Sequence, residues 1–134
     1  MELKTLNEIE IISAPHSKIS EVDFENLTFG NVFTDHMLVC DYVDGAWQKP
    51  VIEPYAPFMI DPSAKVFHYG QAIFEGMKAY KDEQDDVWLF RPDENYHRFN
   101  KSATRMAMPE VPEDIFLGGL HRLLEIEKEW VKKG

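Results

Sequence analysis

Three basic side chains recur at helical spacing late in the sequence, and they are the first candidates for chemistry. Arg98, Lys101 and Arg105 are offset by three and four residues, which places them on one face of an α-helix. An arginine near the start of such a helix can offer its planar guanidinium as a two-pronged donor to a phosphate. The alternative is a solvent-exposed stripe paired with nearby acidic residues, and the spacing alone favours it.

Aromatic side chains close to glycines are the second candidates. Phe29 and Tyr69 each precede a glycine, and Phe74 lies two residues before one. Aromatics beside a sharply turning backbone can line an apolar ligand pocket. Ordinary core packing, with the tyrosine hydroxyl satisfied by one hydrogen bond, is the alternative that the local sequence favours at each position.

Other reactive residue types form no catalytic or metal pattern. Residues 34–36 (TDH) invite comparison with a hydrolytic triad, but no nucleophile stands at a strained turn. We therefore expect Thr34 and Asp35 to make local side-chain-to-backbone hydrogen bonds. The five histidines and the single Cys40 lack metal-ligand spacing, so neither a metal site nor an internal disulfide is predicted.

The charge balance bears on the class of partner. The chain has 14 basic and 24 acidic residues, a net charge of −10. An acidic surface repels polyanions, which disfavours nucleic-acid binding and binding to anionic membranes. No stretch approaches the roughly 20 apolar residues of a membrane span, and the first 20 residues lack the apolar run of a signal peptide. The sequence therefore predicts a cytoplasmic protein.

Short strands separated by turns are expected from residue 36 to residue 90. Residues 36–43 (HMLVCDYV) are rich in β-forming types, and the following Asp44-Gly45 pair predicts a hairpin with a return strand at 46–52. Pro50 indicates an edge or a bulge in that return strand. The further expected elements are short strands at 58–60 and 66–69, a helical turn at 71–75, and a second hairpin of 77–81 with 87–90.

Two helices are expected to follow the strands. Asp93 is the predicted N-cap of the first helix, which Pro109 ends. Its apolar face recurs through Tyr96, Phe99, Ala103 and Met106. The second helix is expected at about 113–133, weakened at the glycine pair 118–119 by roughly 1 kcal/mol per glycine.

This order of elements predicts an α+β fold, with two helices packed on one face of a mainly antiparallel sheet. The chain has 134 residues, 44% of them hydrophobic, which suits one domain with a real core. We expect residues 1–27 to form an extended or mobile leader and residues 28–134 to form the domain.

Taken together, several segments resemble branched-chain amino acid aminotransferases. The resemblance is collinear over about residues 28–134, and the ordered set is far more specific than any one motif. The segments that resemble the family are 29–37 (FGNVFTDHM), 68–79 (HYGQAIFEGMKA), 89–92 (LFRP), the helix with Arg98, Ser102, Ala103 and Arg105, and 129–131 (EWV).

The resemblance implies the small N-terminal domain of a fold-type IV enzyme that uses pyridoxal phosphate. Such enzymes pass an amino group between leucine, isoleucine or valine and 2-oxoglutarate, and they work as homodimers or assemblies of dimers. By the resemblance, Arg98 binds the cofactor phosphate, while Phe29, Tyr69 and Phe74 line the substrate side-chain pocket. Tyr69 is then expected to reach the site of a neighbouring subunit.

One departure from the family bears on activity. The lysine that forms the Schiff base lies in the family's large domain, and no lysine of this chain matches that position. The resemblance therefore implies a fragment without a catalytic residue of its own, inactive alone and without tight cofactor binding.

Two other interpretations stay open. One is a related fold-type IV enzyme, such as a D-amino acid aminotransferase or an aminodeoxychorismate lyase. The other is a stand-alone ligand-binding or regulatory module. The FTDHM and FEGMKA segments favour the branched-chain enzymes.

Overall fold

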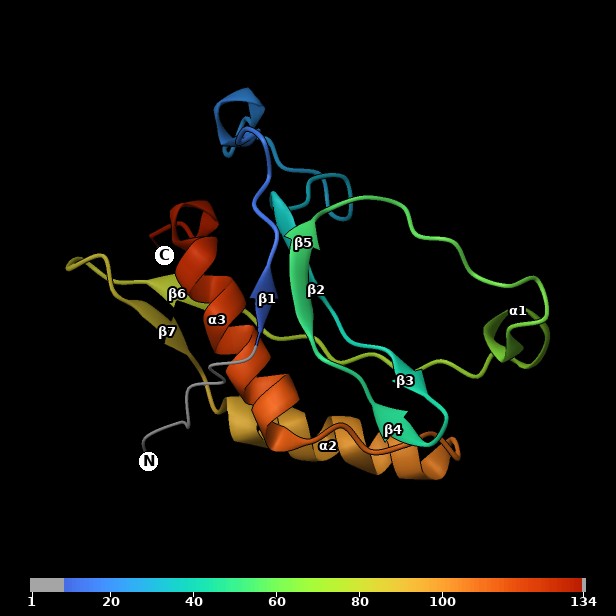
Figure 1. Cartoon of the computed structure of the whole chain (residues 1–134). Helices are drawn as coiled ribbons and strands as arrows, with labels where there is room; N and C mark the ends of the chain where they lie inside the picture. Colours follow the sequence, from blue (N-terminus) through green and yellow to red (C-terminus); the bar gives the residue numbers. More distant parts are fainter. Residues whose placement is uncertain (1–8, 134) are drawn as a thin grey trace.

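The computed structural model describes residues 9–133 and has the predicted α+β architecture (Figure 1). The strands are β1 (Glu10–Ile11), β2 (His36–Val39), β3 (Tyr42–Val43), β4 (Ala46–Trp47), β5 (Val51–Pro54), β6 (Ala79–Lys81) and β7 (Val87–Leu89). The α-helices are α1 (Lys65–Tyr69), α2 (Pro92–Arg105) and α3 (Gly119–Ile126). Residues 1–8 of the predicted leader lie outside the described residues. No helix within residues 9–133 is long and apolar enough to cross a membrane.

A three-stranded sheet in the order β1-β5-β2 forms the centre of the domain (Figure 1). β2 and β5 pair antiparallel, with Leu38 opposite Ile52, and β1 joins the other edge of β5 in parallel. Ile52 is completely buried, as a central strand position requires. Glu10 and Ile11 therefore belong to the sheet, although they fall in the segment expected to be a leader.

The hairpin predicted at Asp44-Gly45 is confirmed. Both residues have positive φ, 51° and 81°, the conformation of the two-residue turn that matches strand twist. The strands on either side are shorter than expected, because each is interrupted: 36–43 divides into β2 and β3, and 46–52 divides into β4 and β5. Pro50 lies in the second interruption, where its lack of an N–H removes no sheet hydrogen bond.

The strand predicted at 66–69 is wrong, because Lys65–Tyr69 forms the single-turn helix α1. Gly70 ends it with φ of 60°, a left-handed conformation that glycine adopts without steric cost. Residues 58–60 and 71–75 form neither the predicted strand nor the predicted helical turn. The β-forming types at 58–60 are exposed and have no partner strand, and an unpaired strand leaves its backbone groups unsatisfied.

Helix α2 begins at Pro92, and its N-cap is Arg91 rather than the predicted Asp93. Proline is favoured at the first helical position because it has no N–H to leave unpaired. The helix ends at Arg105, before Pro109. The predicted apolar face is confirmed for Ala103, which is completely buried. Tyr96 and Phe99 also belong to it, with ring centroids 5.6 and 5.2 Å from that of Phe116.

The second predicted helix is divided into three parts. A π-helical turn at Asp114–Gly118 leads into α3, and a 3-10 turn at Lys128–Trp130 follows it. Gly119 is buried where α3 meets β2, and an added Cβ there would overlap Leu38 Cδ2. The glycine that weakens the helix locally therefore allows its backbone to approach the sheet.

Asp35 joins both ends of the described chain to the sheet. Its carboxylate accepts hydrogen bonds from Ser17 Oγ (2.5 Å), Lys18 N (2.9 Å) and Trp130 Nε1 (3.1 Å). Burial raises the pKa of this carboxyl, but the hydrogen bonds from Lys18, Ser17 and Trp130 outweigh it, and the pKa lies below its usual 3.8. The expectation of purely local bonds is wrong for Asp35.

His36 extends the same connection. Its Nε2 accepts a hydrogen bond from the backbone N–H of Ala14 (2.8 Å), and its Nδ1 contacts the buried carboxylate of Glu127. A ring nitrogen that accepts leaves the other to donate, so Nδ1 carries the proton toward Glu127. Thr34 makes the expected local bond, donating to the carbonyl of His36 (2.9 Å). Residues 34–36 thus hold the fold together rather than forming a triad.

Candidate functional site

The segment of residues 71–76 lies against α2 although it has no regular structure of its own. Gln71 Nε2 donates to the carbonyl of Met106 at the end of the helix (2.8 Å). Asn95, in the second turn of the helix, donates from Nδ2 to the carbonyl of Gly76 (3.1 Å). Side-chain hydrogen bonds at both ends therefore place the segment along the helix.

Arg98 is held by a carboxylate from this segment. Its Nη2 donates to Glu75 Oε1 (2.6 Å) and its Nε donates to Glu75 Oε2 (3.1 Å), the two-pronged geometry that suits a guanidinium and a carboxylate. The Arg98 side chain is 60% exposed and that of Glu75 only 13%. The hydrogen bonds from Arg98 lower the pKa of Glu75, and those to Glu75 raise the pKa of Arg98.

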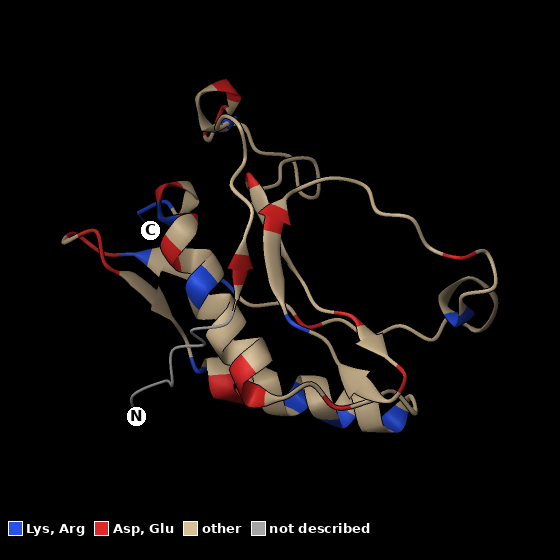
Figure 2. Cartoon of the chain, viewed as in Figure 1, with Lys and Arg blue, Asp and Glu red and all other residues tan. Residues whose placement is uncertain are grey.

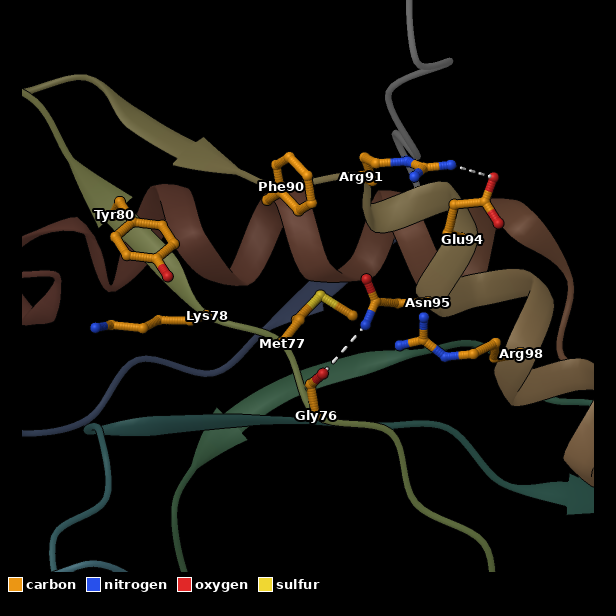
Figure 3. A pocket seen from close by; sticks show the side chains of 9 residues that line it. All are labelled: Gly76, Met77, Lys78, Tyr80, Phe90, Arg91, Glu94, Asn95 and Arg98. Atoms are coloured by element: carbon orange, nitrogen blue, oxygen red, sulfur yellow. Dashed lines mark hydrogen bonds and ion pairs between the residues drawn. The ribbon is translucent and has the colours of Figure 1, made fainter.

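A cavity of about 340 Å³ opens beside Arg98 (Figure 3). One wall comes from residues 76–80 and the other from the first turns of α2 and the residues just before it. The lining residues are Gly76, Met77, Lys78, Tyr80, Phe90, Arg91, Glu94, Asn95 and Arg98. Three of them are cations, and one of these, Arg91, pairs with Glu94 at 3.1 Å. The lining thus combines positive charge with aromatic and aliphatic surface.

The residues of this cavity fit a phosphate group. Arg98 has five N–H donors, and its two hydrogen bonds to Glu75 leave three for another acceptor. Lys78 and Arg91 add positive charge to the same cavity. Along α2 the first turn is acidic and the later turns are basic (Figure 2). A dianion would thus meet fixed donors without a metal ion, and residues 9–133 contain no cluster of His, Cys, Asp or Glu suited to hold one.

A second, more open cavity of about 720 Å³ lies farther along α2. Ile73 and Phe74 form one side of it, and the helix supplies Lys101, Ser102, Thr104, Arg105 and Met106. The predicted basic face is therefore divided, because Arg98 lines the first cavity while Lys101 and Arg105 line the second. Apolar side chains next to two cations would suit a ligand with an aliphatic part and an acidic group.

Comparison with known proteins identifies the relationship. No protein-family model matches the chain. Branched-chain-amino-acid transaminase 1 of Bacillus subtilis (strain 168) is 53% identical over 112 residues, which cover 83% of this chain and 32% of that protein. Branched-chain-amino-acid aminotransferase 2 of the same organism is 48% identical over 116 residues, covering 86% of this chain and 32% of the relative.

A relative from another organism is similar over the same part of the chain. The branched-chain-amino-acid aminotransferase of Mycolicibacterium smegmatis (strain ATCC 700084 / mc(2)155) is 44% identical over 114 residues, covering 84% of this chain and 31% of that protein. Over most of its length the chain is therefore similar to branched-chain aminotransferases. It spans about a third of the length of these curated relatives and matches their N-terminal part.

The three aromatic candidates of this chain do not line one common cavity. Phe29, Tyr69 and Phe74 are 104%, 82% and 89% exposed. Phe74 lines the second cavity, whereas Tyr69 ends α1 and Phe29 precedes β2 in an irregular segment. Neither of the two cavities described above includes Phe29 or Tyr69. The core packing that the local sequence favoured does not occur at any of the three positions.

The structure adds Glu75, Asn95 and Gln71 to the site, and none of them was predicted from the sequence. A signal was present in α2, because Asn95 and Arg98 are three residues apart and so share one helix face. Two donors on one face require an acceptor, and a carboxylate is the natural one. The acceptor, Glu75, is 20 residues from Asn95 and 23 from Arg98 in a segment without regular structure, so periodicity could not identify it.

Proposed function

We propose that residues 28–134 are the N-terminal domain of an enzyme that transfers the amino group between leucine, isoleucine or valine and 2-oxoglutarate, with pyridoxal phosphate as cofactor. We also propose that residues 1–27 form a leader to this domain, which adds the strand Glu10–Ile11 to its central sheet. The observation that supports the proposal most is the 53% identity to a branched-chain transaminase over 112 residues. In the same proposal the enzyme is a cytoplasmic homodimer.

Arg98 is the residue that would bind the cofactor phosphate. It lines a cavity with two other cations, and it keeps three donors beyond those engaged by Glu75. Bound pyridoxal phosphate supplies an electron sink for chemistry at the carbon that bears the amino group. Lys78 and Arg91 would add to the field that attracts the phosphate dianion.

Phe29, Tyr69 and Phe74 are proposed to line the pocket for the substrate side chain. Each presents a large apolar surface to solvent, and such surfaces on a folded protein mark places where another part of the molecule or a ligand docks. Phe74, with Ile73 and Met106 beside it, already forms an apolar wall. Each buried methylene of a leucine side chain would contribute roughly 0.8 kcal/mol against such a wall.

The lysine that bonds to the cofactor is proposed to belong to the two thirds of the relatives' length that this chain does not span. Lys78 is the one amine among the residues proposed above, and its proposed role is to attract the phosphate. The role of this chain is therefore to bind the phosphate and shape the pocket, and the chain alone would not catalyse transamination.

A chimera tests this proposal. The matching residues of B. subtilis transaminase 1 are replaced by those of this chain, and amino transfer from leucine to 2-oxoglutarate is measured together with cofactor affinity. We expect transfer, and we expect Arg98→Ala to raise the cofactor Kd roughly 10- to 100-fold, the effect of losing a charge-assisted hydrogen bond. Arg98→Lys keeps the charge but not the fork, and should give an intermediate loss.

Two results would contradict the proposal. A folded chimera that binds cofactor but acts on D-alanine rather than leucine would favour a related fold-type IV enzyme. A chimera in which Arg98→Ala leaves the cofactor Kd unchanged would remove the phosphate role and return Arg98 to a structural ion pair with Glu75.

A further inference from the structure

Glu75 is a carboxylate whose hydrogen bonds are organised around one guanidinium. Arg98 donates to both of its oxygens, and Asn95 Nδ2 adds a third bond to Oε1 (3.0 Å). Asn95 itself is buried and also donates to the carbonyl of Gly76, so it fixes the backbone directly after Glu75. The carboxylate is therefore held from two sides and cannot follow Arg98 if Arg98 moves.

This arrangement restricts a side chain that would otherwise be mobile. A mostly exposed arginine samples many rotamers, and ordering it on ligand binding costs free energy. Its two hydrogen bonds to Glu75 hold the guanidinium of Arg98 in one plane. The remaining N–H donors of Arg98 lie at the edge of the cavity (Figure 3). The entropy of fixing Arg98 is then lost during folding rather than when an anion binds.

We propose that Glu75 and Asn95 are positioning residues that hold Arg98 in its phosphate-binding orientation. The inference rests on the proposed function, because the anion is taken to be the phosphate of the cofactor. Neither residue touches that phosphate in this scheme. Glu75 acts through Arg98, and Asn95 acts through Glu75.

The obvious competing effect is electrostatic. Glu75 is negative and lies next to the cavity, so its charge alone would weaken the binding of an anion. Glu75→Gln removes the charge and also the second acceptor oxygen for Arg98. Losing the charge would strengthen the binding of an anion, whereas losing the positioning of Arg98 would weaken it. The two effects also differ for Asn95→Ala, which changes no charge but removes the support of the carboxylate.

The test uses the chimera and two probes, pyridoxal phosphate and pyridoxal. The dissociation constant of pyridoxal divided by that of pyridoxal phosphate isolates the contribution of the phosphate, because the rest of the two molecules is the same. Positioning predicts that Glu75→Gln and Asn95→Ala each lower this ratio, Glu75→Gln by roughly tenfold. Glu94→Gln is the matched control, since it removes a negative charge from the cavity lining without contacting Arg98, and the ratio should not fall.

A second measurement separates positioning from loss of structure. In the ¹⁵N-labelled chain of 134 residues, the Nε–H signal of Arg98 should exchange slowly with solvent, and either variant should speed its exchange while the melting temperature stays within a few degrees. A Glu75→Gln variant that binds pyridoxal phosphate as well as or better than the unsubstituted chimera overturns the positioning role.

Failure of the proposed function has a different signature. If the unsubstituted chimera binds pyridoxal as tightly as pyridoxal phosphate, no phosphate site exists and both proposals fall. If it prefers pyridoxal phosphate and both variants keep that preference, only the positioning role is refuted.

Discussion

Replacing Gly119 by alanine tests how closely α3 packs against the central sheet. The backbone of Gly119 is ordinary right-handed helix, with φ of −63°, so alanine meets no conformational obstacle there. The obstacle is Leu38 on β2. An added Cβ would overlap Leu38 Cδ2, and it would lie 3.4 Å from Cδ1 and 3.6 Å from Cγ.

The expected magnitude is the difference between two effects. Leu38 Cδ2 must retreat by roughly 1 Å to reach ordinary carbon–carbon contact, and forcing an extra methyl into a packed site costs about 1–3 kcal/mol. Alanine is a better helix former than glycine by up to about 1 kcal/mol. Gly119→Ala should therefore lower the free energy of unfolding by about 0–2 kcal/mol.

A double-mutant cycle with Leu38→Ala separates these effects. The shorter side chain removes the atoms that the new methyl would meet, so in that background Gly119→Ala should raise the free energy of unfolding by about 0.5–1 kcal/mol. The coupling between the two sites should then be about 1–3 kcal/mol. Urea unfolding of the four chains measures it. Equal effects of Gly119→Ala in the two backgrounds would show that Leu38 does not limit the approach of the helix.

Three further predictions concern Asp35, Phe29 and the lysines. The folded-state pKa of Asp35 lies below its usual 3.8, so its contribution to stability is complete above about pH 4 and is lost as the pH falls through the folded pKa. Asp35→Asn should lower the free energy of unfolding by about 1–3 kcal/mol at pH 7 and make it depend less on pH in the acid range. In the chimera, Phe29→Ala should lower the ratio of kcat/KM for leucine to that for alanine, with the cofactor Kd nearly unchanged; a shift in that Kd instead would assign Phe29 elsewhere. The chain of 134 residues, mixed with pyridoxal phosphate and reduced with borohydride, should show no stoichiometric adduct at a single lysine by mass spectrometry and no turnover of leucine.

The elements predicted correctly are those with strong local signals. The Asp44-Gly45 turn needs only two residues with positive φ, and the sequence contains both. Helix α2 combines a proline at its first position with an apolar face of regular spacing, so its existence was predictable although its N-cap was not. In each case the residues that decide the structure are neighbours in the chain.

The elements predicted wrongly depend on partners that are distant in the chain. Residues 66–69 contain β-forming types, but no strand lies beside them, and a single helical turn satisfies their backbone instead. Asp35 was expected to bond locally, yet its partners include Trp130, 95 residues away. Gly119 could be recognised as a weak helix former, but its contact with Leu38 depends on how the helix packs on the sheet.

The candidate site also has one part that is held by contacts within this chain and one part that is not. The part proposed to bind phosphate lies between residues 75 and 98, where one helix turn presents Asn95 and Arg98 to a segment that the helix itself holds in place. That part can form within this chain. The aromatic part has no such local support, since Phe29 and Tyr69 stand exposed on separate segments. Glu75 therefore orients Arg98 within this chain, whereas the proposed substrate pocket would need further protein surface around Phe29 and Tyr69 to close.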